Sequence, residues 1–174
     1  RRMRNLWEES IFELSRLLNA DPEGMVFVTN ATMGVNTVLR SLKLSQGDEI
    51  IVPDHAYQAC KNAIDFVTER SGARTVIVHV PFRLGDDSEI IDPILSAVTG
   101  RTVLAMIDTV SSPTGVRMPF ESLVYQLQNR GVDVLVDAAH GPGIVPLDIS
   151  KLNPAYITGN CHKWLCTPKG SAFL

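Results

Sequence analysis

The sequence predicts an α/β fold in which a mostly parallel sheet is covered by helices on both faces. Two observations lead to this prediction. Short apolar runs alternate along the chain with longer segments whose apolar residues recur at helical spacing. The short runs are apolar at successive positions, as expected for strands that are buried on both faces. No internal repeat or linker interrupts the 174 residues, so we expect one compact domain over residues 1–174.

The first predicted helix covers residues 6–18, and the turn-forming residues 21–24 end it. Its apolar positions are Leu6, Trp7, Ile11, Leu14, Leu17 and Leu18. A short buried strand is predicted at residues 25–28. Residues with capping side chains at 29–32 then precede a second helix, whose apolar stripe comprises Val35, Val38, Leu39 and Leu42.

The alternation continues to the end of the chain. In chain order we expect strand 49–52, helix 57–70, strand 75–80, helix 90–98, strand 102–107, helix 120–130, and strands 132–136 and 155–158. The pair Asp92–Pro93 is a candidate start for helix 90–98, because proline is tolerated in the first turn.

Composition excludes several classes of function. The net charge of -3 and the lack of a basic stretch argue against a nucleic-acid partner. No segment resembles a signal sequence or approaches the roughly 20 apolar residues of a membrane span, so we expect no membrane partner. The three cysteines, Cys60, Cys161 and Cys166, match no zinc-binding spacing. They indicate reduced thiols in a cytoplasmic protein without a metal site.

The two ends of the sequence suggest a truncated chain. It begins without methionine and ends in the apolar run 170–174, which has the character of a strand. We therefore expect that a C-terminal part of the protein is missing.

Polar residues follow several of the predicted strands. They are Thr29, Asp54, Asp108, Asp137 and Asn160. In parallel sheets of this kind, ligands bind at the carboxyl ends of the strands. We therefore expect a binding site at this edge.

Asp137 and Lys163 are the most informative residues there. Asp137 could cap a loop, or it could pair with the protonated ring nitrogen of a pyridine cofactor, which would give a buried carboxylate the partner it needs. Lys163 could be an ordinary surface lysine, or a desolvated amine that forms an imine with an aldehyde cofactor. The flanking His162 and Trp164 favour the second interpretation.

Three further segments fit a flat, phosphorylated ligand, although each also has an ordinary structural explanation. The helix start at 29–34 could bind a phosphate through its amides and the Thr32 hydroxyl, but capping residues begin helices everywhere. His55 or Tyr57 could stack on a ring, or be satisfied core residues. Residues 111–115, which include Ser112, could line the site or form a turn.

Together these segments resemble the class V aminotransferase family of pyridoxal-phosphate enzymes, of fold type I. The resemblance runs from Phe27 to Leu174 and is carried mainly by residues 136–141 and by His162–Lys163–Trp164 with Gly170. Within the family, residues 30–36, 57–60 and 112–115 look most like the isopenicillin N epimerase-like and cysteine-lyase-like members.

The resemblance implies a role for each candidate residue toward pyridoxal 5'-phosphate. Lys163 would form the Schiff base and carry the proton, Asp137 would pair with the ring nitrogen, and His140 would hydrogen-bond the phenolic oxygen. The phosphate would be held by the amides of Ala31 and Thr32, by the Thr32 hydroxyl and by His162. Tyr57 would stack on the ring with His55 as the competing stacker, Ser112 would lie near the ring, and Asn160 stands where many relatives have a serine or threonine phosphate ligand.

The resemblance also implies an activity. We expect an enzyme that acts on an amino acid, with carbon–sulfur lyase (cysteine desulfhydrase-like) or epimerase chemistry. The alternatives are a true class V aminotransferase and a non-catalytic fragment or interaction module. The family's small C-terminal domain, which usually supplies the arginine for the substrate carboxylate, is expected to be missing. The full-length enzyme is expected to be a homodimer. A nicotinamide-binding domain is disfavoured, since no glycine-rich dinucleotide turn follows the first strand.

Overall fold

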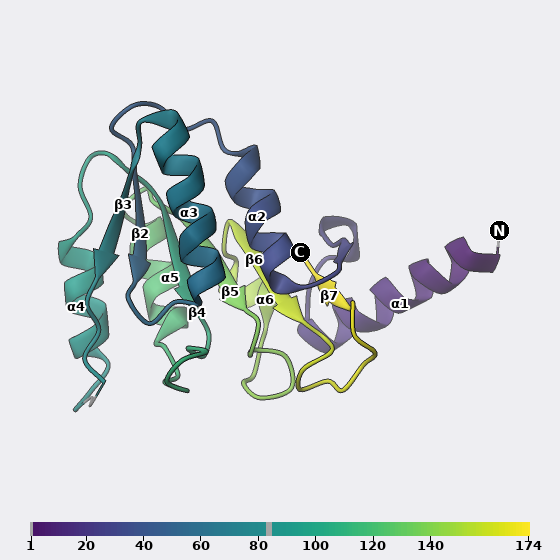
Figure 1. Cartoon of the computed structure of the whole chain (residues 1–174). Helices are drawn as coiled ribbons and strands as arrows, with labels where there is room; N and C mark the ends of the chain where they lie inside the picture. The colour runs from purple at the N-terminus through teal and green to yellow at the C-terminus, as the bar shows by residue number, and fades with distance from the viewer. Residues whose placement is uncertain (1, 83–84) are drawn as a thin grey trace.

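The computed structural model of the chain describes residues 2–82 and 85–174. Within these residues seven strands form one sheet in the order β1-β7-β6-β5-β4-β2-β3 (Figure 1). The strands are β1 (Phe27–Val28), β2 (Glu49–Pro53), β3 (Arg74–Val78), β4 (Thr102–Asp108), β5 (Asp133–Ala138), β6 (Tyr156–Asn160) and β7 (Ala172–Phe173). Neighbours among β2 to β6 pair in parallel, and β7 pairs antiparallel with β6 and β1. The predicted mostly parallel α/β fold is confirmed.

Helices cover both faces of the sheet (Figure 1). They are α1 (Arg2–Leu18), α2 (Ala31–Ser41), α3 (Gln58–Ser71), α4 (Ser88–Ser96), α5 (Phe120–Gln128) and α6 (Ile149–Leu152), with a 3-10 turn at Pro22–Gly24. One apolar core lies between the sheet and α2 and α3, and the other lies between the sheet and α1, α4 and α5. Successive residues of a strand enter opposite cores: Ile50 packs beneath α2 and α3, and Ile51 packs on the other face. This explains why apolar residues stand at successive positions in the strands rather than at every second one.

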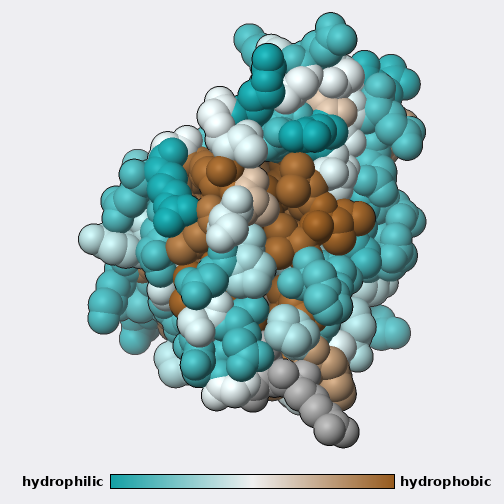
Figure 2. Space-filling model, turned by 90° about the vertical axis from the view of Figure 1, so that its left-hand side faces the viewer, coloured by the Kyte–Doolittle hydropathy of each residue, from teal (hydrophilic) through white to brown (hydrophobic). Residues whose placement is uncertain are grey.

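Apolar surface remains uncovered at both sides of the described chain. Strand β3 forms one edge of the sheet, and Figure 2 shows a hydrophobic area on the face that presents this edge. Ile77 in β3 and Phe82 just after it are 60% and 68% exposed. At the opposite side the first half of α1 reaches away from the sheet (Figure 1), and Met3 and Leu6 in it are exposed.

The structure corrects the start of one predicted helix. Helix α4 begins at Ser88, and Pro93 lies inside it rather than in its first turn. The earlier start follows from the two acids before the helix, because the Ser88 amide donates to Asp86 Oδ1 at 2.7 Å and the Ile90 amide donates to the Asp87 carbonyl at 3.1 Å. These bonds satisfy amides that a helix start otherwise leaves unpaired.

The short outer strands also differ from the prediction. The apolar run 25–28 forms a strand only at Phe27–Val28, because its partner β7 has just two residues. Val26 nevertheless exchanges two hydrogen bonds of 2.9 Å with Leu174. The one-turn helix α6 was not predicted. Its four residues are too few for an apolar period, and the Asp148 carboxylate caps it by accepting from the Lys151 amide at 2.9 Å.

The parallel register brings the predicted polar residues to one edge. Asp108 at the end of β4 stands opposite Asp137 in β5, and Asp137 stands opposite Thr158 in β6. Asn160 ends β6 two residues later. The carboxyl ends of β4, β5 and β6 therefore form one continuous polar edge.

Candidate functional site

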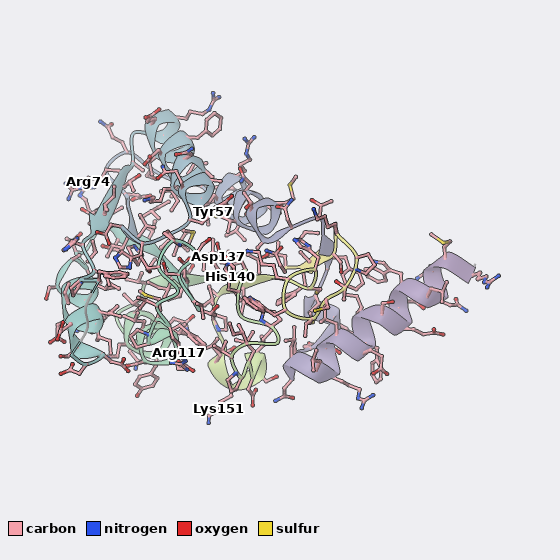
Figure 3. All side chains as sticks on the ribbon, turned by 60° about the horizontal axis from the view of Figure 1, so that its bottom comes forward. Tyr57, Arg74, Arg117, Asp137, His140 and Lys151 are labelled. Atoms are coloured by element: carbon pink, nitrogen blue, oxygen red, sulfur yellow. The ribbon has the colours of Figure 1, made fainter. Side chains whose placement is uncertain are left out.

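A pocket of about 620 Å³ opens at the carboxyl ends of the strands. Its lining comprises Asn30, Thr32, Tyr57, Ala59, Asp108, Val110, Ser112, Asp137, Ala139, His140, Asn160 and Lys163. In Figure 3, the labelled Tyr57, Asp137 and His140 lie close together near the middle of this face. A larger cavity of about 870 Å³ lies against α1, α5 and α6, and none of the residues predicted for the site lines it. The strand-end pocket is therefore the candidate site.

Asp137 is buried at the floor of this pocket. Its Oδ1 accepts the Ala139 amide proton at 2.9 Å, and its Oδ2 accepts from the Cys60 thiol at 3.4 Å. Burial raises the pKa of Asp137, and these two bonds and the charge of Lys163 oppose that rise. The bond to Ala139 shows that Asp137 does cap a turn. Capping and facing a ligand are thus compatible roles for one carboxylate.

Asp108 is a second buried acid beside Asp137. Burial and the negative charge of Asp137 raise its pKa well above the usual value, while Lys163 and Lys61 act in the opposite direction. Its Oδ1 has no hydrogen-bond partner among the described residues. A neutral Asp108 can offer the pocket a hydroxyl donor, which an ionised carboxylate cannot.

Lys163, His140 and Trp164 form a chain of contacts at the pocket wall. The Lys163 amine nitrogen lies 3.0 Å from His140 Nε2, and the Trp164 indole N–H donates to His140 Nδ1 at 3.2 Å. Desolvation lowers the pKa of Lys163, against the pull of Asp137, Asp108 and Cys60. Desolvation, followed by the charge of Lys163, lowers the pKa of His140. Both changes favour neutral side chains at the site.

The first turn of α2 borders the other side of the pocket. The Ala31 amide donates to Asn160 Oδ1 at 2.8 Å, and the Met33 amide donates to the side chain of the capping residue Asn30 at 2.8 Å. Thr32 lies between these two positions and lines the pocket with a hydroxyl group. The Ala31 amide, which was expected to hold a phosphate, instead fixes Asn160. An anion here would rely on the Thr32 amide and hydroxyl, the remaining amide of Asn160 and the helix dipole.

Close packing holds α2 in this place. A Cβ atom on Gly34 would lie 2.1 Å from Thr158 Oγ1 in β6. The helix can therefore approach the strand only because residue 34 lacks a side chain. This approach sets the first turn of α2 beside Asn160 and the strand ends.

Three of the predicted site residues do not line the pocket: Ala31, His55 and His162. His55 Nδ1 lies 3.3 Å from the Thr114 hydroxyl, outside the pocket, whereas its competitor Tyr57 lines it. His162 Nδ1 lies 2.9 Å from the Ser171 carbonyl oxygen, so this nitrogen carries the proton and donates.

Several residues without a predicted role are brought to the site by the fold. Asn30, Ala59, Val110 and Ala139 line the pocket, Asp108 stands beside Asp137, and Cys60 and Trp164 bond to site residues. The strand-end position of Asp108 was a usable signal. The contacts of Cys60 and Trp164 could not be predicted, because they depend on where α3 and the loop after β6 meet the strand ends.

Neither a metal-binding cluster nor a membrane-spanning helix is found in the described ranges, 2–82 and 85–174. No cluster of three or more histidine, cysteine or acidic side chains there is arranged to bind a metal ion. No helix in those ranges has both the length and the apolar character needed to cross a bilayer.

Comparison with known proteins identifies the family. The profile of the family described as "Aminotransferase class-V" matches residues 2–174. Isopenicillin N epimerase of Streptomyces clavuligerus is 34% identical over 161 residues, which make up 92% of this chain and 40% of the relative. A probable chloroplastic L-cysteine desulfhydrase of Arabidopsis thaliana is 35% identical over 92% of this chain and 37% of its own length. The chain thus spans about two fifths of these relatives.

Solved structures agree with the fold. The cystine C–S lyase C-DES, in complex with its reaction product cysteine persulfide, superposes with a TM-score of 0.92 at 25% identity, over 99% of this chain and 46% of the lyase. The cysteine desulfurase CsdA of Escherichia coli superposes with a TM-score of 0.88 at 24% identity, over 99% of this chain and 43% of CsdA. With the match of the family profile to nearly every residue, the chain belongs to the class V aminotransferase family.

Proposed function

We propose that the chain is the cofactor-binding large domain of a pyridoxal-phosphate enzyme that performs carbon–sulfur lyase or epimerase chemistry on an amino acid. The family depends on pyridoxal 5'-phosphate and acts on amino-acid substrates. The observation that carries the proposal is the meeting of Lys163, Asp137 and His140 in one pocket at the strand ends. When bound, the cofactor supplies an aldehyde for covalent attachment and a ring that accepts the electron pair left by a lost α-proton.

The residues of the pocket fit this cofactor. A volume of about 620 Å³ is within the usual range for cofactor sites. Asp137 is a buried acid, and pairing with a cationic ring nitrogen would lower the free-energy cost of burying its carboxylate. Asp108 Oδ1, which lies beside Asp137, is a buried polar atom with no hydrogen-bond partner among the residues that the structure describes. The helix start with Thr32 offers a donor set for a phosphate.

Lys163 would perform both covalent attachment and proton transfer. Attachment requires a free amine, and desolvation increases the free fraction by lowering the pKa of Lys163. Once a substrate amino group takes its place, the released Nζ can hold a proton taken from the substrate α-carbon. His140, at 3.0 Å, keeps this nitrogen at the pocket wall.

Asp137 would keep the ring nitrogen protonated. A carboxylate that accepts bonds from the Ala139 amide and the Cys60 thiol is fixed in orientation, and it can offer its remaining lone pairs to the pocket. Tyr57 lines the pocket from the start of α3, where its ring could cover one face of a flat ligand. Ser112 and Asn160 would add polar contacts around the rim and the phosphate.

The choice of lyase or epimerase chemistry rests on the relatives. Those named above are an epimerase at 34% identity and a probable cysteine desulfhydrase at 35% identity. Both chemistries begin with removal of the α-proton. They differ in whether the proton returns from the other face or a thiol leaves. A homodimer, which the resemblance implies, stays a prediction for light scattering of the full-length enzyme.

Proton exchange tests the shared first step. The chain is incubated with pyridoxal phosphate and L-cysteine in D2O, and deuterium at the α-carbon is followed by NMR together with sulfide release and change of chirality. We expect exchange in the wild type and in Lys169→Ala, because Lys169 is an exposed lysine of the same loop. Lys163→Ala should show none. Equal exchange in Lys163→Ala would refute the role of this lysine.

The products then separate the candidate functions. Sulfide with pyruvate identifies a lyase, and D-cysteine without sulfide identifies an epimerase. A 2-oxo acid that retains its sulfur identifies a true aminotransferase. Exchange that is absent while the cofactor stays attached to Lys163 would contradict the catalytic part of the proposal and favour a domain that only holds the cofactor.

A further inference from the structure

His140 contacts two nitrogen atoms at once, one through each of its ring nitrogens. The Trp164 indole Nε1 lies 3.2 Å from His140 Nδ1, and the Lys163 Nζ lies 3.0 Å from His140 Nε2. The two rings stand with centroids 6.3 Å apart and planes tilted by 55°. His140 is therefore held between a donor that never changes and an amine that can be charged or neutral.

The first contact determines where the proton of His140 lies. An indole N–H can only donate, so His140 Nδ1 must present its lone pair to Trp164. A neutral imidazole carries one proton, which is then on Nε2. Desolvation lowers the pKa of His140, which favours the neutral ring.

The second contact then determines the state of Lys163. With its proton on Nε2, His140 is the donor toward Lys163 Nζ, and Nζ must accept through a lone pair. An ammonium group has three protons and no lone pair, so it cannot accept. The contact at 3.0 Å is thus satisfied only by a free amine.

We propose that Trp164 is a positioning residue that fixes His140 in its Nε2–H tautomer, and that this tautomer selects the free-amine form of Lys163. This inference rests on the proposed function in one respect: there, the free amine of Lys163 is the form that attaches the cofactor. It concerns three side chains of this chain and needs no bound cofactor.

Removing the indole donor should weaken the preference of Lys163 for its free-amine form. In Trp164→Phe the ring of His140 can move its proton to Nδ1, and Nε2 can then accept from a Lys163 ammonium group. A neutral hydrogen bond changes such an equilibrium by about fivefold. The other titratable groups facing Lys163 are Asp137 from β5, Asp108 from β4 and Cys60 from α3, and all of them remain in the variant.

Nitrogen NMR of the cofactor-free protein, labelled with 15N-histidine, tests the tautomer directly. The chain has four histidines, and His140→Gln identifies the signal that belongs to His140. We expect the wild type to show a protonated Nε2 and an unprotonated Nδ1 at neutral pH. In Trp164→Phe the ratio of the Nε2–H tautomer to the Nδ1–H tautomer of His140 should fall about fivefold. A wild-type proton on Nδ1, or an unchanged signal in Trp164→Phe, would overturn the proposal.

The second tryptophan provides a matched control. Trp7 is similarly half-exposed and packs edge-on against Phe27, away from the pocket. Trp7→Phe should leave the His140 signal unchanged. A change in Trp7→Phe as large as that in Trp164→Phe would show a general loss of structure and would also contradict the assignment.

The reactivity of Lys163 gives an independent readout. A neutral acylating reagent labels only free amines, and mass spectrometry of the peptides compares Lys163 with Lys169 as an internal reference. At neutral pH we expect Trp164→Phe to lower labelling of Lys163 by about fivefold relative to Lys169. Equal labelling in wild type and variant would refute the link to Lys163. Failure to bind pyridoxal phosphate would contradict the proposed function but would leave both of these measurements interpretable.

Discussion

Replacement of Gly34 by alanine tests the close packing of α2 against β6. The new Cβ would lie 2.1 Å from Thr158 Oγ1 and 2.7 Å from Thr158 Cβ. Thr158 is fully buried and donates its hydroxyl proton to the Phe173 carbonyl at 2.7 Å. The threonine cannot turn away without breaking this buried bond, so the helix and the strand must move apart.

Three effects set the size of the loss. Forcing an extra methyl group into a packed core costs about 1–3 kcal/mol. Losing the bond from Thr158 to Phe173 would add about 1–3 kcal/mol, because buried polar groups would be left unpaired. Alanine is favoured over glycine inside a helix by about 1 kcal/mol, which offsets part of this. We expect a net destabilisation of about 3 kcal/mol, which for a chain of this size lowers Tm by about 6–12 °C.

Thermal unfolding followed by circular dichroism measures this difference. Gly100→Ala is the matched control, because no atom lies within 4 Å of a Cβ at that exposed position. It should change stability by no more than about 0.5 kcal/mol. If Gly34→Ala melts at the same temperature as Gly100→Ala, the close approach of α2 to β6 is wrong, and so is the placement of Thr32 at the pocket.

Three more predictions follow from buried polar groups. The Glu49 carboxylate accepts from Thr99 and Thr102 and pairs with Arg74, and these bonds, that from Thr99 first, lower its pKa below 4.5. The stability that the Glu49 carboxylate contributes is present above its pKa in the unfolded chain and is lost as pH falls through its pKa in the folded chain. Below about pH 4.5, Tm of Glu49→Gln should therefore depend less on pH than Tm of the wild type. Parallel curves of Tm against pH would contradict this. Burial and the charge of Asp137 raise the pKa of the Cys60 thiol, and Cys161 is buried too. A thiol reagent should therefore react only with Cys166 while the chain is folded. Rapid reaction of a second cysteine in the folded chain would contradict this. Cys60→Ala removes a hydrogen-bond donor to Asp137 and should weaken binding of pyridoxal phosphate about fivefold in an absorbance titration. Cys60→Ser keeps a donor and should bind the cofactor nearly as the wild type does. Equal binding by the wild type and both variants would refute the contact between Cys60 and Asp137.

The fold could be predicted from the sequence because its signals are local. The apolar run of β5 and the helical stripe of α2 are each contained in a few consecutive residues, and tertiary packing did not override them. The start of α4 was misplaced because capping by Asp86 competes with the preference of Pro93 for a first turn. Local patterns cannot decide between two such signals.

The site could be predicted only in part. The rule that ligands bind at strand ends pointed to Asp137 and Asn160, and both line the pocket. His140, which lines it too, was expected only from the resemblance to the family. The bond between the Ala31 amide and Asn160 could not be predicted, because it joins residues 129 positions apart. The same is true of the contact between Cys60 and Asp137, at a separation of 77 positions. Such contacts depend on the packing of α2 and α3 against the sheet rather than on neighbouring residues.

The central claim is that Lys163 holds pyridoxal phosphate covalently, and reductive trapping tests it most directly. The folded chain is mixed with the cofactor, reduced with borohydride, digested, and analysed by mass spectrometry. We predict a cofactor adduct on the peptide that carries Lys163, and no such adduct in Lys163→Ala. An adduct confined to other lysines, or no adduct at all in a folded chain, would contradict the claim.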